Sequence, residues 1–109
     1  MKKVEVVIME NVWYSQRDVI EKKETLANSY DDFVEYIEDS KQRKEAIRKN
    51  KLISKDLHFC NELIKEFENI KKYFSSKNII LNDKNLFYRK GNFKICYKGK
   101  SYYRKFILK

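Results

Sequence analysis

The sequence predicts an α+β fold in which two central helices pack on an antiparallel sheet. Two observations predict it. Apolar residues over positions 57–74 recur every three or four residues, which is helical spacing, and the last part of the chain alternates apolar with polar residues between glycine-containing turns. At 109 residues the chain has room for one compact domain, residues 1–109. The expected order is β(β)ααββββ, which ends in a C-terminal β-meander.

The first expected element is a strand at residues 4–9, because Val-Glu-Val-Val-Ile-Met follows a partly buried strand pattern. Residues 17–27 fit a weak helix or a strand, and we expect a strand paired with the first. The structure of residues 10–28 as a whole stays open. In particular, Trp13 and Tyr14 fit either the core or an interface.

Helical spacing begins after this region. Ser29 is expected to cap a helix from Tyr30, with acidic residues in its first turn, where a helix favours negative charge. An apolar stripe would be formed by Phe33, Val34, Tyr36 and Ile37. Residues 38–45 contain no apolar residue, so this part is either one long helix with a solvated middle or two pieces. Ser54 is expected to cap a second helix that ends at residues 75–78.

Short strands are expected at residues 79–81, 86–90, 93–98 and 101–108. Gly91-Asn92 and Gly99-Lys100 would form the two-residue hairpin links, because glycine accepts positive φ. Lys90 would then pair with Phe93. One face of the sheet would pack on the helix of residues 57–74. The other face would carry Arg89, Lys94 and Lys105 in one row and Phe87, Cys96 and Tyr103 in the next, with Lys98 beyond.

Charge is distributed unevenly along the chain. The net charge is +9, yet residues 1–49 sum to −1 and residues 50–109 to +10. The last 26 residues hold nine Lys and Arg, seven aromatic residues and no acid. A basic region of this kind raises the local potential and speeds encounters with anions, so it predicts a polyanionic partner.

Nucleic acid, free or within a nucleoprotein, is the expected partner of a non-enzymatic binding protein. Cations on the sheet would neutralise phosphates, and the interleaved rings would stack on bases. The predicted site consists of Phe87, Arg89, Lys94, Lys98, Tyr103 and Lys105. The alternative is that Phe87 and Tyr103 pack under the N-terminal strands and the lysine row is a solvated edge.

Other chemistry is poorly supported. The chain has two cysteines in no metal-binding spacing and one histidine, His58, so we expect neither a metal nor another cofactor. Two widely separated cysteines suit a reducing compartment. No run approaches the ~20 apolar residues that a membrane span needs, so we expect a cytoplasmic protein without a membrane partner. The sequence does not indicate an oligomeric state.

Acidic residues offer a second kind of site. Asp31, Asp32, Glu35 and Glu38 recur at helical spacing and would form one acidic helix face. This pattern is usually a solvated face. It also fits a protein–protein inhibitor that contacts a basic enzyme surface.

The window from Arg89 to Tyr97, Arg-Lys-Gly-Asn-Phe-Lys-Ile-Cys-Tyr, resembles the central hairpin of RelE-like toxins, small basic ribonucleases that cut messenger RNA on the ribosome. The resemblance implies that Arg89 or Lys94 stabilises the transition-state phosphate, with Tyr97 or Tyr103 nearby. The family's later arginine is loosely matched by Arg104. The overall profile is also similar to small phage or mobile-element proteins, among them anti-CRISPR inhibitors of bacterial defence nucleases.

Overall fold

The computed structural model of the chain describes residues 12–108. It contains helix α1 (Gln16–Asn28), the 3-10 helix η1 (Val34–Tyr36) and helix α2 (Ser40–Ser75), then strands β1 (Leu86–Arg89), β2 (Asn92–Tyr97) and β3 (Lys100–Lys105). The strands form an antiparallel sheet in the order β1-β2-β3. The α+β class is confirmed. The described part of the sheet has three strands, because residues 79–81 form none, and the expected strand at residues 4–9 lies outside the described residues.

Residues 16–28 form helix α1, so the expected strand at residues 17–27 is wrong. Ser15 starts the helix with a reciprocal capping box: its hydroxyl accepts the Asp18 backbone N–H at 3.2 Å, and the Asp18 carboxylate accepts the Ser15 backbone N–H at 3.0 Å. Val19 and Leu26 lie two turns apart on one face, and both are buried. The Ser-x-x-Asp spacing is the local signal that decides between helix and strand here.

Helix α2 runs without a break, so the expected cap at Ser54 is wrong. It begins instead at Asp39, whose carboxylate accepts the backbone N–H groups of Lys41 at 2.9 Å and Gln42 at 3.2 Å. Ser29 is the C-cap of α1 rather than the start of a helix. The end of α2 at Ser75 is as expected.

The connection between the helices is fixed by a side chain from α2. Asn50 is buried, its amide oxygen accepts the backbone N–H of Asp31 at 3.0 Å, and its amide nitrogen donates to the Asp31 carbonyl at 2.9 Å. This pair of hydrogen bonds holds residues 30–39, here called the tip, in turns and the short η1. The helix expected from Tyr30 is therefore wrong. The expected apolar stripe is also wrong as a core face, because Phe33 and Tyr36 are exposed.

Both hairpin turns have two residues with positive φ, 47° and 81° at Lys90-Gly91 and 48° and 76° at Lys98-Gly99. This is the pattern of type I′ turns, whose twist matches that of the strands. Each turn lies one residue earlier than expected, so Leu86 pairs with Ile95 rather than with Tyr97. A two-residue shift keeps every side chain on its expected face but changes its cross-strand neighbours.

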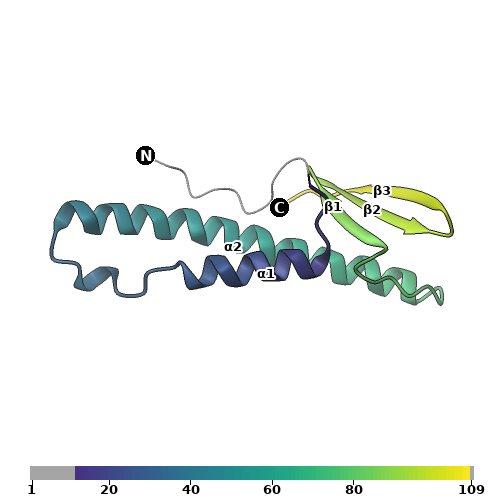
Figure 1. Cartoon of the computed structure of the whole chain (residues 1–109), viewed down its shortest axis with the longest axis horizontal. Coiled ribbons are helices and arrows are strands. Elements are labelled where there is room, and N and C mark those ends of the chain that lie inside the picture. The colour runs from purple at the N-terminus through teal and green to yellow at the C-terminus, as the bar shows by residue number, and fades with distance from the viewer. Residues whose placement is uncertain (1–11, 109) are drawn as a thin grey trace.

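The inner face of the sheet packs on the C-terminal half of α2, as expected (Figure 1). Phe67 of α2 meets Phe93 of β2 edge-on, with ring centroids 4.9 Å apart. Helix α1 runs antiparallel along α2 and adds Val19 and Leu26 to the core. The molecule is 58 × 24 × 23 Å, with the sheet toward one end and the tip at the other. None of the described helices is long and apolar enough to cross a bilayer.

Candidate nucleic-acid interface

The side of the sheet that faces away from α2, here called the outer face, follows from strand alternation. It carries Phe87, Arg89, Lys94, Cys96, Tyr103 and Lys105. Their neighbours along β1 and β2, such as Tyr88 and Phe93, are buried, whereas none of these six is. Five of the six predicted nucleic-acid-binding residues therefore share one accessible face. Lys98 lies instead in the β2–β3 turn, with its ammonium 5.4 Å from the ring centroid of Tyr97.

Trp13 completes the outer face. Tyr14 forms an isolated bridge with Tyr88, and the two backbone hydrogen bonds of this bridge are both 2.8 Å long. Because the Tyr14 side chain is buried, the neighbouring Trp13 side chain lies on the opposite side, over the sheet. The choice between core and interface that the sequence leaves open is thus resolved: Tyr14 belongs to the core.

The Trp13 ring lies against two cations and a second ring. The Arg89 guanidinium carbon is 4.3 Å from its centroid, and the Lys94 ammonium is 5.2 Å away. The Tyr103 centroid is at 6.5 Å, with the two ring planes tilted by 44°. Such distances are those of cation–π contacts. We call Trp13, Phe87, Arg89, Lys94 and Tyr103 the outer-face cluster.

The order of side chains across the strands differs from the expected one. Lys94 lies between Phe87 and Tyr103, and Asn92 lies between Arg89 and Lys105. The predicted row of three adjacent cations is therefore wrong. Each cation of the sheet instead stands beside a ring or an amide, which lowers the cost of holding them on one face.

The cations of the outer face have no acidic partners among residues 12–108. The described ion pairs are Arg17–Glu21, Lys65–Glu62 and Arg104–Glu66. The last of these lies on the inner side of β3, where the Arg104 guanidinium is 3.9 Å from the Glu66 carboxylate. No acid among residues 12–108 therefore neutralises Arg89, Lys94 or Lys105.

The acidic residues do not form a helix face. Asp31 lies just before the turn that holds Asp32, Glu35 lies in η1, and Glu38 comes just before the start of α2. They gather around the tip, at the far end of the molecule from the sheet (Figure 1). The prediction of one acidic helix face is therefore wrong, although the acids stay close together in space.

Catalytic chemistry has few candidates in the described part of the chain. No three His, Cys, Asp or Glu side chains of residues 12–108 are arranged to hold a metal ion. Both cysteines are free; burial, helped by the charge of Asp56, raises the pKa of the Cys60 thiol to about 11. Among the residues that the toxin resemblance suggests, Arg89, Lys94 and Tyr103 share the outer face. Tyr97 and Arg104 alternate to the inner side.

No protein-family model matches the chain, and comparisons with curated proteins and with solved structures likewise found no match.

Proposed function

We propose that this protein is a non-enzymatic binding protein whose outer face engages nucleic acid, either free or within a nucleoprotein. One observation carries the proposal. Arg89 and Lys94 lie against the Trp13 ring, beside Tyr103, without an acidic partner among the described residues. Phosphates would meet the two cations, and Lys105 at the edge would add a third contact. Counterion release from the phosphates would drive binding.

The two central rings have different roles in this proposal. Cations already lie against Trp13, so this ring serves to position Arg89 and Lys94. Tyr103 has 63% of its surface exposed and offers the ring on which an unpaired base stacks. A single strand presents such bases, whereas a duplex does not. The arrangement therefore favours single-stranded RNA or DNA over duplex DNA.

The test is fluorescence anisotropy with labelled single-stranded RNA, single-stranded DNA and duplex DNA at two salt concentrations. We expect tighter binding to the single strands and a steep salt dependence. Tyr103→Ala should weaken single-strand binding by roughly tenfold, since a stacked base contributes about 1–3 kcal/mol. Lys94→Glu should weaken binding and lower the salt slope by about one or more.

Lys44→Glu is the matched control. It makes the same charge change on an exposed residue near the N-terminal end of α2, away from the sheet. Equal losses for Lys94→Glu and Lys44→Glu would show a general polycation effect and refute the site. Trp13 is the only tryptophan of the chain, so its fluorescence gives a second, label-free measure of binding at the outer face.

The biological setting that fits best is inhibition of a nucleoprotein enzyme, as phage and mobile-element inhibitors of defence nucleases do. The high Lys and Arg content and the basic outer face support this setting. A cleavage assay with an RNA-guided nuclease would test it. Wild-type protein should slow cleavage and the Lys94→Glu variant should not.

A messenger-RNA-cleaving toxin is the second candidate, because Arg89, Lys94 and Tyr103 lie together on the face that such a hairpin would use. Induced expression distinguishes the two. A toxin arrests growth, and Arg89→Ala relieves the arrest, whereas a binding protein of the proposed kind leaves purified messenger RNA and ribosome-bound RNA uncut.

A further inference from the structure

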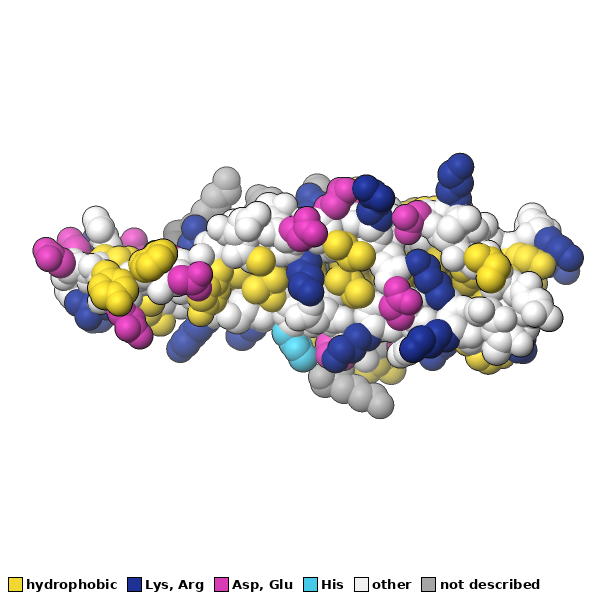
Figure 2. Space-filling view, turned by 90° about the horizontal axis from the view of Figure 1, so that it is seen from below, with side chains coloured by type: hydrophobic (Ala, Val, Ile, Leu, Met, Phe, Trp, Pro, Cys, Tyr) yellow, Lys and Arg dark blue, Asp and Glu magenta, His cyan; other side chains and the backbone are white. Residues whose placement is uncertain are grey.

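Large apolar side chains are exposed at the tip. Phe33 and Tyr36 have 70% and 77% of their surfaces accessible, and their ring centroids lie 6.2 Å apart. Figure 2 shows hydrophobic side chains gathered at this end of the molecule, with acidic and also some basic side chains around them. Two adjacent rings exposed to this extent are a feature of protein-binding surfaces, since aromatic residues are enriched at interface hot spots.

The tip presents these rings on a fixed backbone. Beside the two hydrogen bonds to Asn50, the Phe33 N–H donates to the Asp31 carboxylate at 2.9 Å, and the Tyr36 N–H donates to the Phe33 carbonyl at 2.9 Å. A surface that is already ordered loses little conformational entropy when it binds.

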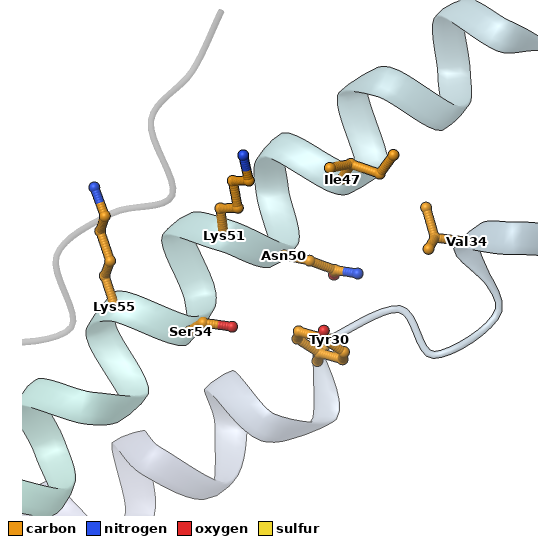
Figure 3. Close-up of a pocket in the computed structure, with 7 residues that line it drawn as sticks. All are labelled: Tyr30, Val34, Ile47, Asn50, Lys51, Ser54 and Lys55. Atoms are coloured by element: carbon orange, nitrogen blue, oxygen red, sulfur yellow. The ribbon is translucent and has the colours of Figure 1, made fainter.

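A shallow hollow of about 380 Å³ lies between the tip and α2. Its apolar lining comes from Tyr30, Val34 and Ile47. Figure 3 shows Tyr30 and Asn50 directed into this space, while the amino groups of Lys51 and Lys55 point away from it. The hollow can accept one apolar side chain next to the exposed rings.

The charge of the tip around Phe33 and Tyr36 indicates which kind of partner fits it. Residues 30–39 contain five acids and no Lys or Arg, in a chain whose net charge is +9. None of the ion pairs among residues 12–108 uses an acid of the tip. Such a surface attracts Lys and Arg, which can pair with carboxylates and also pack on aromatic rings.

We propose that the tip is a docking surface for a Lys- and Arg-rich protein segment, with Phe33 and Tyr36 as anchors and the hollow as the seat of an apolar side chain. This site does not depend on the nucleic-acid proposal. The two surfaces lie at opposite ends of the molecule, so both can be occupied at once.

The probe is a synthetic peptide of Arg, Lys and Leu, compared with a charge-reversed peptide of Asp, Glu and Leu. Amide chemical shifts locate binding, and anisotropy of the labelled peptide measures its affinity. We expect the basic peptide to shift residues of the tip and the hollow. Two double variants, Phe33→Ala/Tyr36→Ala and Asp32→Lys/Glu35→Lys, should each weaken binding of the basic peptide by about tenfold. Both variants should fold, because all four side chains are exposed.

Tyr73→Ala and Asp83→Lys are the controls, since they remove an exposed ring and reverse an exposed charge away from the tip. Neither should change affinity. Unchanged affinity of the Phe33→Ala/Tyr36→Ala variant would overturn the proposal, as would equal binding of the acidic peptide. Self-association that this variant abolishes would also overturn it, because the occupant would then be a second copy. Intact nucleic-acid binding by the same variant separates this test from that of the outer face.

Discussion

Asn50 determines the shape of one end of the molecule with a single amide group. Its two hydrogen bonds go to the N–H and the carbonyl of one residue, Asp31, nineteen positions earlier in the chain. No other side chain satisfies both groups of a backbone residue in this way in the described structure. The geometry requires an amide, which is donor and acceptor at once.

Asn50→Ala should therefore lower the free energy of unfolding by about 1–3 kcal/mol, because two partly buried backbone groups lose their partner. Urea denaturation measures the change. Asn69→Ala is the matched control on the exposed side of α2 and should be near neutral. A loss no larger than that of Asn69→Ala would show that the tip holds its shape without Asn50.

The environment of Asp56 should make the stability of the protein depend on pH. Burial raises the pKa of its carboxyl group above the usual value. The folded protein then holds this proton more tightly than the unfolded chain. The contribution of Asp56 to the stability of the fold is therefore complete below the pKa of the unfolded chain, about 3.9. It is lost as the pH rises through the raised pKa of the folded protein.

Asp56→Asn should consequently stabilise the protein at neutral pH, and this gain should shrink as the pH falls through the raised pKa of Asp56 and be lost below about 3.9. Thermal melts at the two pH values measure this difference. Glu24→Gln, on the exposed side of α1, should give no such pattern. A neutral-pH melting temperature below that of the wild type would contradict the assignment.

At the scale of elements, the type I′ turns decide which side chains of the sheet meet. Lys90 and Lys98 hold the left-handed conformation, with φ of 47° and 48°, which costs a non-glycine residue about 1–2 kcal/mol. Asparagine tolerates this conformation better, and Asn-Gly is the preferred type I′ pair.

Lys90→Asn and Lys98→Asn should each stabilise the protein by a few tenths to about 1 kcal/mol. Chemical denaturation checks the sign. Lys84→Asn, outside the strands in the connection before β1, removes the same charge and should not stabilise. If both hairpin variants are destabilised, the turns do not sit at Lys90-Gly91 and Lys98-Gly99.

The helices and strands also show which parts of the fold the sequence predicts and which it does not. The inner face of the sheet was predictable, because alternation fixes the face even when the register shifts by two residues. The neighbours of Lys94 were not, because they depend on which residues take positive φ. The apolar spacing of residues 17–27 fits a helix and a strand equally well, so it does not predict helix α1, and only the capping box of Ser15 and Asp18 indicates it.

The candidate site was predictable only in part for a related reason. Five of its residues follow from the alternation of strands whose faces were correctly assigned. Trp13 does not, because its place depends on a bridge between Tyr14 and Tyr88, far apart in sequence. The exposure of Phe33 and Tyr36 was not predictable either, because their spacing also fits a buried face of a helix. The hydrogen bonds of Asn50 to Asp31 hold this segment in a non-helical conformation.

At the scale of the whole molecule, the core lies where α1 and the sheet pack on α2. The buried residues of α2 begin at Asn50 and continue to Ile70, so its first turns carry none. Its C-terminal half packs against both α1 and the sheet. Its N-terminal turns carry no buried side chain and are largely exposed.

Amide hydrogen exchange should therefore be faster at residues 44–49 than at residues 57–70 of the same continuous helix, because local opening is easier where few apolar contacts are lost. Exchange followed by NMR resolves the two segments. Uniform protection along α2 would show that the helix opens only as one unit.

The elongated shape has a consequence for how the molecule rotates in solution. A body of 58 × 24 × 23 Å spins about its long axis faster than it turns end over end. Amide N–H bonds of α2 lie along that axis, whereas those of the strands point across it (Figure 1). Nitrogen-15 transverse relaxation should accordingly be faster in the helix than in the sheet, even where both are equally rigid. Uncorrected relaxation rates would therefore imitate slow internal motion in the most ordered part of α2.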